Sequence, residues 1–318
     1  MIFYIQSLIH ELNITRREAQ QMTELAPKQS QVIEQPEQVK GPWREAWSSF
    51  KKSKSALVGT GIVLFFVLIA IIGPFIAPQG INDQNLSLRL QPPSAEFWFG
   101  TDDLGRDIFS RILHGARISL TVGLSAVLIS SIVGSFLGII AGYYGRWIDT
   151  IISRIFDIML AFPSILLAIA VVSILGPSLR NALIAIAIIN VPSFGRLIRS
   201  RVLSIKEEEY IHAARAIGMK NSRILWNHIL PNSMTPVIVQ GTLAIATAII
   251  EAAALGFLGL GAEAPQPEWG KMLADARMFL LNAPWAMIFP GLAIMLTVIG
   301  FNLMGDGLRD ALDPKMKN

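Results

Sequence analysis

The sequence predicts an all-α integral membrane protein with six membrane spans, and two observations support this. Hydrophobic residues make up 52% of the 318 residues and charged residues only 16%, with a mean hydropathy of +0.50. This composition is too apolar for an ordinary soluble protein. Six apolar segments also come close to the roughly 20 residues that a helix needs to cross a bilayer.

The first 55 residues are expected to form a polar N-terminal tail. They lack the apolar core that a secretory signal requires. The whole chain contains no cysteine, which excludes disulfide frameworks and thiolate metal sites. The chemistry of the protein must therefore come from other residue types.

The spans are expected in the following order. The first, Ala56–Ala77, precedes a loop over residues 78–117, and a core of five further spans fills residues 118–304 before a short tail, residues 305–318. Asn190, Pro192 and Gly195 interrupt the fourth span, which is the weakest. The five core spans are expected at Ile118–Gly142, Ile151–Leu175, Leu179–Leu197, Met234–Leu258 and Trp285–Met304.

The distribution of basic residues predicts the orientation. With the N-terminus in the cytoplasm, 20 of the 27 Lys and Arg residues fall on the cytoplasmic side. Short loops rich in Lys and Arg are retained there. Both termini and the polar stretch at residues 203–232 are therefore expected in the cytoplasm.

Small and ionisable residues within the spans raise two open choices. Gly134, Gly138 and Gly142 recur every four residues, a spacing that lets helix backbones approach closely, either inside one subunit or between subunits. Glu251 is costly inside a span, so it is expected either to line a translocation pathway or to brace a helix contact. Arg154 and Asp157, one turn apart, are expected to form a local ion pair.

Residues 203–232 predict a helix, a turn and a second helix. Strong helix formers run from Leu203 to Ile217, and Gly218 supplies a residue that commonly ends a helix. Asn221 or Ser222 is suited to cap the second helix, which Pro231 is expected to stop. The apolar face needs cover, from the underside of the bundle or from another protein. It comprises Ile211, Ala214, Ile217, Ile224, Leu225 and Trp226.

The stretch "HAARAIGMKNSRILWNHILP" resembles the EAA loop of permease subunits in binding-protein-dependent ABC importers. Three further stretches, "FGTDDLGRDIFSRILHGARISL", "EAAALGFLGLGAEAPQPEWGKML" and "FNLMGDGLRDALDPK", resemble the C-type permease of dipeptide, oligopeptide and nickel importers. The resemblance covers roughly Trp43 to Lys315. It implies the six-span fold of a type I importer permease, located in the bacterial inner membrane.

The resemblance also implies a set of partners. A second, B-type permease would complete the pathway, two ATPase subunits would bind ATP and magnesium, and an extracytoplasmic binding protein would deliver the substrate. The chain itself has no G-x-x-x-x-G-K-[ST] phosphate loop, so no cofactor, catalytic residue, metal or nucleic acid is assigned to it. Residues expected to couple to an ATPase are Glu208, Glu209, Tyr210, His212, Ala213, Ala214, Arg215, Gly218, Arg223, Leu230 and Pro231.

Two departures from the family pattern and several alternatives stay open. His212 replaces the usual first glutamate, so acidic contacts are expected to move to Glu208 and Glu209, and Gly256 is expected to loosen the helix end before "FLGLG".

Thr101 or Asp102 is expected to cap the helix after the loop, with the "FGTDDLGRD" segment serving architecture or binding-protein docking. The substrate could be a di- or oligopeptide, a nickel chelate or another small solute. An ion-gradient-driven transporter is the alternative from a different class.

Overall fold

The computed structural model describes residues 42–312, which divide into two units at the boundary between Glu45 and Ala46. Of the first unit, only the opening turn of helix α2 (Pro42–Lys52) is described. Expectations for residues 1–41 and 313–318 lie outside the described residues. Within residues 46–312, regular structure is helical apart from one isolated bridge between Thr101 and Asp107.

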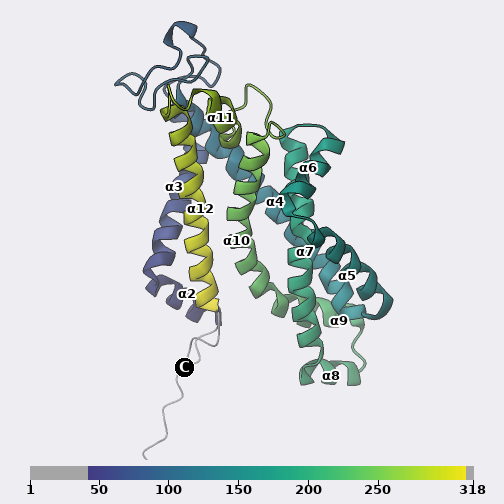
Figure 1. Ribbon diagram of the computed structural model, residues 1–318. Helices are drawn as coiled ribbons and strands as arrows, with labels where there is room; N and C mark the ends of the chain where they lie inside the picture. Colours follow the sequence, from purple (N-terminus) through teal and green to yellow (C-terminus); the bar gives the residue numbers. More distant parts are fainter. Residues whose placement is uncertain (1–41, 313–318) are drawn as a thin grey trace, which may run out of the picture. The chain divides into compact units, whose positions relative to one another are not determined.

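The described chain contains five helices long and apolar enough to cross a membrane, and a sharply bent helix pair that could form a sixth span. Figure 1 shows the helices side by side, with α11 (Trp269–Ala276) at one end of this unit and α8 (Glu209–Ala216) at the other. The expected all-α bundle is confirmed. The five helices are α3 (Lys54–Ile76), α4 (Ile108–Tyr144), α7 (Leu179–Lys206), α10 (Leu230–Phe257) and α12 (Trp285–Leu312).

The third expected span is not one straight helix. It divides into α5 (Arg146–Ala161) and α6 (Ser164–Leu175), which meet at an angle of 98°. Phe162, at the break, has extended backbone angles, with φ of −95° and ψ of 142°. Pro163 explains this, because the ring of a proline excludes the helical conformation from the residue before it.

The fourth expected span, by contrast, is uninterrupted. Helix α7 runs through Asn190, Pro192 and Gly195 without ending and continues to Lys206, beyond the expected end at Leu197. Pro192 and Gly195 are buried, and the ring of Phe156 from α5 packs directly against Gly195. Packing on both sides therefore compensates for the weak helix formers.

Helix α4 lies against α7 along a seam of small residues. A Cβ atom added at Gly134 would lie 2.5 Å from the carbonyl oxygen of Val191, and one at Gly142 would lie 3.0 Å from that of Arg199. At Gly138 the added atom would overlap the backbone of Gly195. The three glycines thus pack within one subunit, which answers the choice in favour of intrachain contact.

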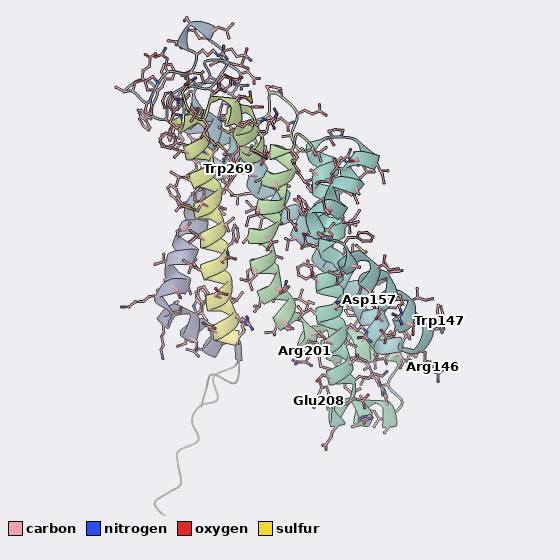
Figure 2. The ribbon with its side chains drawn as sticks, in the orientation of Figure 1. Arg146, Trp147, Asp157, Arg201, Glu208 and Trp269 are labelled. Carbon is pink, nitrogen blue, oxygen red and sulfur yellow. The ribbon has the colours of Figure 1, made fainter. Side chains whose placement is uncertain are left out.

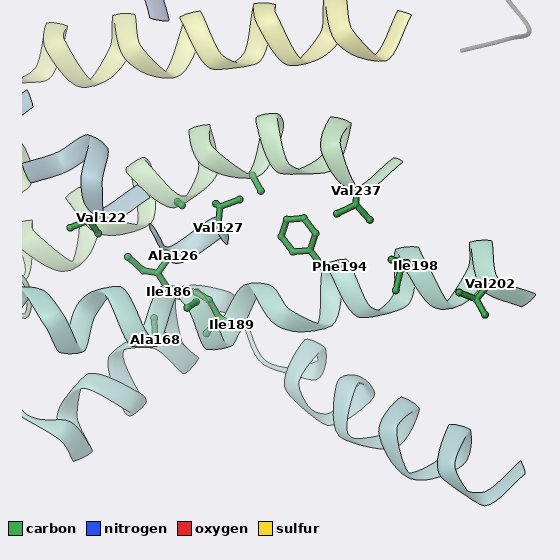
Figure 3. Close-up of a cluster of buried hydrophobic side chains, with 14 of the residues drawn as sticks. Val122, Ala126, Val127, Ala168, Ile186, Ile189, Phe194, Ile198, Val202 and Val237 are labelled. Carbon is green, nitrogen blue, oxygen red and sulfur yellow. The ribbon is translucent and has the colours of Figure 1, made fainter. Parts of the chain in front are cut away.

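A buried apolar cluster extends along this seam (Figure 3). Phe194, Ile198 and Val202 of α7 are fully buried, and the ring of Phe194 extends toward α10, where Val237 belongs to the same cluster. Nearer the α11 end, Val122 and Ala126 of α4 continue the cluster. Dispersion contacts in such a close-packed interior are individually small but numerous.

Ion pairs attach α5 to α7. The Nε and Nη2 atoms of Arg199 both donate to the carboxylate of Asp149, and the bond from Nη2 is 2.7 Å long. Asp157 pairs with Arg196 and also lies 4.0 Å from Arg154, so the expected local pair of Arg154 and Asp157 is present but shared. These charges lie at the edge of the bundle, where partial solvation lowers the cost of holding them.

Helix α11 is inserted into the other end of the bundle. Its N-cap, Glu268, accepts hydrogen bonds from the N–H groups of Gly270 (2.9 Å) and Lys271 (2.8 Å). Burial nevertheless raises the pKa of Glu268 above its ordinary value. Trp269 is fully buried and donates from Nε1 to the carbonyl of Ile112 at 3.2 Å. Gly256 lies against this cap, and α10 continues through it to Phe257.

The "FGTDDLGRD" segment forms a fixed turn. The Oδ1 atom of Asp102 accepts from the N–H groups of Leu104 (2.9 Å) and Arg106 (3.0 Å), while its Oδ2 accepts from Arg106 Nε at 2.7 Å. The cap of α4 is Asp107, not Thr101 or Asp102, and α4 begins at Ile108, ahead of the expected span. Burial, followed by repulsion from Asp102, raises the pKa of Asp103. This geometry fits the architectural interpretation.

The α4–α7 seam generates a prediction. Gly138→Ala should destabilise the purified permease complex by about 1–3 kcal/mol, because overpacking forces two backbones apart. Thermal unfolding in detergent measures this change.

Gly61→Ala in α3 is the matched control, because a Cβ atom there meets no other atom within 4 Å. It should be neutral or slightly stabilising, since alanine favours helix more than glycine does. Equal unfolding temperatures for Gly138→Ala and the unaltered complex would contradict the close approach.

Candidate functional site

The candidate site is the surface formed by α8 and the turn that follows it. Figure 2 shows Glu208, which precedes α8, at the end of the bundle opposite Trp269. Helix α8 lies between the end of α7 and the short helix α9 (Asn221–Ile224). All residues proposed from the sequence for this loop fall within the described chain.

The first expected helix is divided. Leu203–Lys206 is the last turn of α7, and Glu208 then adopts an extended conformation, with φ of −71° and ψ of 142°, before α8 begins. A straight continuation would carry Ile211 and Ala214 away from the bundle. The bend instead returns them to it, where Ile211 is fully buried. Burial of apolar surface thus overrides local helix propensity.

The second expected helix does not stop at Pro231. Residues Leu225–Ile229 form a π turn that leads from α9 directly into α10, and Pro231 lies in the first turn of α10. The wider π turn directly before Pro231 lets the helical path continue past a residue that has no N–H to donate. Leu230 and Pro231 therefore join the loop to a membrane span rather than ending it.

Gly218 ends α8 as expected. Its φ is 78°, in the left-handed region. The N–H of Gly218 donates to the carbonyl of Arg215 at 2.9 Å, and that of Met219 donates to Ala214 at 3.1 Å. These two bonds define a Schellman motif, in which glycine is strongly preferred at the left-handed position.

The apolar residues of the loop divide into two groups. Ile211, Ala214 and Ile224 are buried against the bundle, with Leu225 partly so. Ile217 is 79% exposed and Trp226 is 69% exposed. One apolar face is thus used internally, and a second remains uncovered in this chain.

Polar residues of the same loop are exposed as well. Glu208, Glu209 and His212 are exposed, and His212 Nε2 lies 3.9 Å from a carboxylate oxygen of Glu207. Tyr210 is 43% exposed and its ring lies 6.2 Å from that of His228. The remaining proposed residues, Ala213 and Arg223, are exposed on the same loop.

Tyr143, at the end of α4, makes three interactions with the loop, and the sequence did not identify it as a site residue. Its hydroxyl donates to Asn221 Oδ1 at 2.7 Å, and its carbonyl accepts from Lys206 Nζ at 3.0 Å. The guanidinium of Arg215 lies 6.0 Å from the ring centroid, within cation–π range. Asn221 therefore binds α4 instead of capping the second helix. The tyrosine pair "YYG" at the end of a span was the available signal.

Glu251 lies far from α8, within α10. It is buried and accepts a hydrogen bond at 2.9 Å from Asn190 Nδ2 of α7. Asn190 also donates to the carbonyl of Ile186 at 2.9 Å. A buried carboxylate needs such a donor, because an unpaired one would carry a large desolvation cost. The structure thus places Glu251 at a contact between two spans.

The described residues offer no metal site. Within residues 42–312, no three His, Asp or Glu side chains come together in a group that could hold a metal ion.

Two family profiles match this chain. One, described as "Binding-protein-dependent transport system inner membrane component", matches residues 134–318. The other, described as "N-terminal TM domain of oligopeptide transport permease C", matches residues 41–93. Together they include all of the candidate surface and the first span.

Similar proteins and a solved structure point to the same family. A dipeptide transport system permease protein, DppC, of Alkalihalophilus pseudofirmus is 67% identical over 277 residues, covering 87% of this chain and 91% of that protein. A di/tripeptide transport system permease protein of Pseudomonas aeruginosa is 50% identical, covering 87% and 93%. A chain of the inward-facing MetNI methionine ABC transporter is similar in fold, with a TM-score of 0.53, 19% identity, and coverage of 63% of this chain and 96% of that chain.

The profile match over more than half of the chain, and the relatives that align along most of its length, show that this protein belongs to the inner membrane components of binding-protein-dependent transport systems, as a multi-pass, non-catalytic permease subunit.

Proposed function

We propose that this chain is the C-type permease subunit of an ABC importer for dipeptides. It forms half of the translocation pathway together with a second, B-type permease, two ATPase subunits drive it, and an extracytoplasmic binding protein supplies the peptide. The names of the 67% and 50% identical relatives support the peptide substrate. Membership in a binding-protein-dependent family leaves no place for the ion-gradient alternative.

The observation that carries the proposal is the uncovered apolar face beside α8. Ile217 projects from a polar loop outside the helices that are long and apolar enough to cross a membrane, so lipid does not account for its exposure. Trp226 is exposed near the start of the helical stretch that leads into α10. Exposed aromatic and aliphatic side chains surrounded by charges are typical of protein contact sites. We assign this face to a groove on one ATPase subunit, with Glu208, Glu209 and Arg223 at its polar edge.

The attachment of α8 to the bundle provides the means of coupling. Ile211 and Ala214 fix one side of α8 on the buried cluster, and Tyr143 links the loop to α4. A displacement of α8 by the ATPase must therefore move α4 and α7 with it. This corresponds to rigid-body switching, in which packed elements move without deforming internally.

Glu251 is assigned to bracing rather than to the pathway. Its hydrogen bond with Asn190 joins α10 to α7, the two spans that enclose the loop in sequence. A brace between these spans would make them respond together when α8 moves. The carboxylate also needs this donor, since its burial is otherwise unfavourable.

We predict that α8 faces the cytoplasm and α11 the opposite side. Because the chain has no cysteine, single cysteines give clean labelling with an impermeant thiol reagent. Gln84 and Met278 are exposed at the α11 end, and Ser222 and Asn227 are exposed at the α8 end. Gln84→Cys and Met278→Cys should react from outside intact cells, whereas Ser222→Cys and Asn227→Cys should react only after permeabilisation. The reverse pattern would overturn the orientation.

Gly218→Val should weaken the link between α8 and the ATPase. A left-handed conformation costs a residue with a side chain roughly 1–2 kcal/mol, and a β-branched residue more, so the turn beside Ile217 would change shape. In reconstituted complexes, dipeptide uptake and hydrolysis stimulated by the loaded binding protein should both fall at least tenfold, while membrane insertion stays normal.

Gly259→Val is the matched control. Gly259 ends α10 with a φ of 77° and the same two Schellman bonds, and, as at Gly218, an added Cβ atom would meet no atom within 4 Å. It should lower stability by a similar amount yet keep the ATPases bound and stimulated. If both variants lost the ATPases equally, strain alone would explain the effect and α8 would lose its assigned role.

A further inference from the structure

A groove of about 630 Å³ opens at the α11 end of the bundle. Its walls come from three segments that are distant in sequence: one turn of α4, the start of α7, and the connection between α10 and α11. The polar residues that line it are Arg117, Thr121, Ser178, Arg180, Glu263 and Gln266. A volume of this size is typical of small-molecule sites.

The charged side chains of the groove are not engaged with other protein groups. Among residues 42–312, none of Arg117, Arg180 and Glu263 makes an ion pair within 4.0 Å or a side-chain hydrogen bond, whereas the nearby Arg106 and Arg111 both pair with Asp102. The paired arginines are buried and the groove arginines are exposed. Arg106 and Arg111 therefore stabilise the fold, whereas Arg117 and Arg180 present their charges to the solvent in the groove.

The arrangement of charge defines a class of ligand. Two guanidinium groups favour a carboxylate, because charge-assisted hydrogen bonds from Arg to carboxylate are strong and directional. One carboxylate, Glu263, favours an ammonium group. A short peptide with free termini carries one group of each kind. Leu179, Leu183 and Ile118 add apolar surface for its side chains.

We propose that this groove receives a short peptide on its way from the binding protein to the translocation pathway. Arg117 and Arg180 hold its terminal carboxylate, and Glu263 holds its terminal ammonium group. This inference rests on the proposed function of dipeptide import and adds a substrate site to it. The site binds the substrate before it enters the translocation pathway. It is separate from the α8 surface, which lies at the other end of the bundle (Figure 1).

The test uses the complete importer in proteoliposomes, with unaltered binding protein and alanyl-phenylalanine as the peptide. The double variant Arg117→Gln/Arg180→Gln should import at least tenfold less peptide per ATP hydrolysed, while hydrolysis stimulated by the loaded binding protein stays within twofold. Glu263→Gln should show a weaker loss of the same kind. Arg117→Lys/Arg180→Lys keeps both charges and should recover part of the uptake.

Arg277→Gln is the control, because Arg277 is an exposed arginine at the same end of the bundle but outside the groove. It should leave uptake per ATP unchanged. Unchanged uptake in the double variant would overturn the groove assignment. A parallel fall in uptake and hydrolysis would also overturn it, because it would identify the groove as a docking surface for the binding protein. If the unaltered importer took up no dipeptide, the proposed function would fail first, and the peptide site with it.

Discussion

The close approach of α4 and α7 is the constraint on which the rest of the structure depends. Lipid tails are as apolar as the side chains, so spans gain little by simply hiding apolar surface, and van der Waals contact has to hold them together. Gly134, Gly138 and Gly142 provide that contact by admitting the backbone of α7. With its backbone supported along this seam, α7 continues through Pro192 and reaches Lys206 as one helix.

The seam also explains how a loop outside the spans can act on them. Tyr143 follows directly after the last seam glycine, Gly142, and it is the residue that holds the loop through Asn221, Lys206 and Arg215. The buried residues Ile211 and Ile224 fix the inner side of the loop, while Ile217 and Trp226 face away. One loop thus carries inner apolar side chains that attach it to the bundle and outer ones that we propose bind an ATPase subunit.

The existence and approximate positions of the spans could be predicted from apolar length, because the bilayer fixes the number of residues that a helix needs. The breaks within the helices could not be predicted, because the sequence shows where a proline lies but not what surrounds it. Pro163 ends a helix at an exposed position, where Phe162 is 56% exposed. Pro192 does not, since it is buried within the seam.

The candidate site was predictable to a similar extent. The turn at Gly218 followed from local chemistry, because a glycine after a helical stretch predicts a left-handed C-terminal residue. The role of Tyr143 and the partner of Glu251 depend on contacts between residues more than sixty positions apart, which a single sequence does not reveal. The division of the apolar loop residues into inner and outer groups likewise required the fold.

The central claim is that α8 moves as one body with α4 and α7. Spin labels at Ala213→Cys on α8 and Phe136→Cys on α4, both exposed positions in a cysteine-free chain, measure this within the reconstituted importer. On ATP binding, the distance between these labels should change by less than about 2 Å, the scale of a small helix shift, while the distance from Ala213 to a label on the second permease changes by more. A nucleotide-dependent change within the Ala213–Phe136 pair would show that the loop bends independently, and would contradict the account.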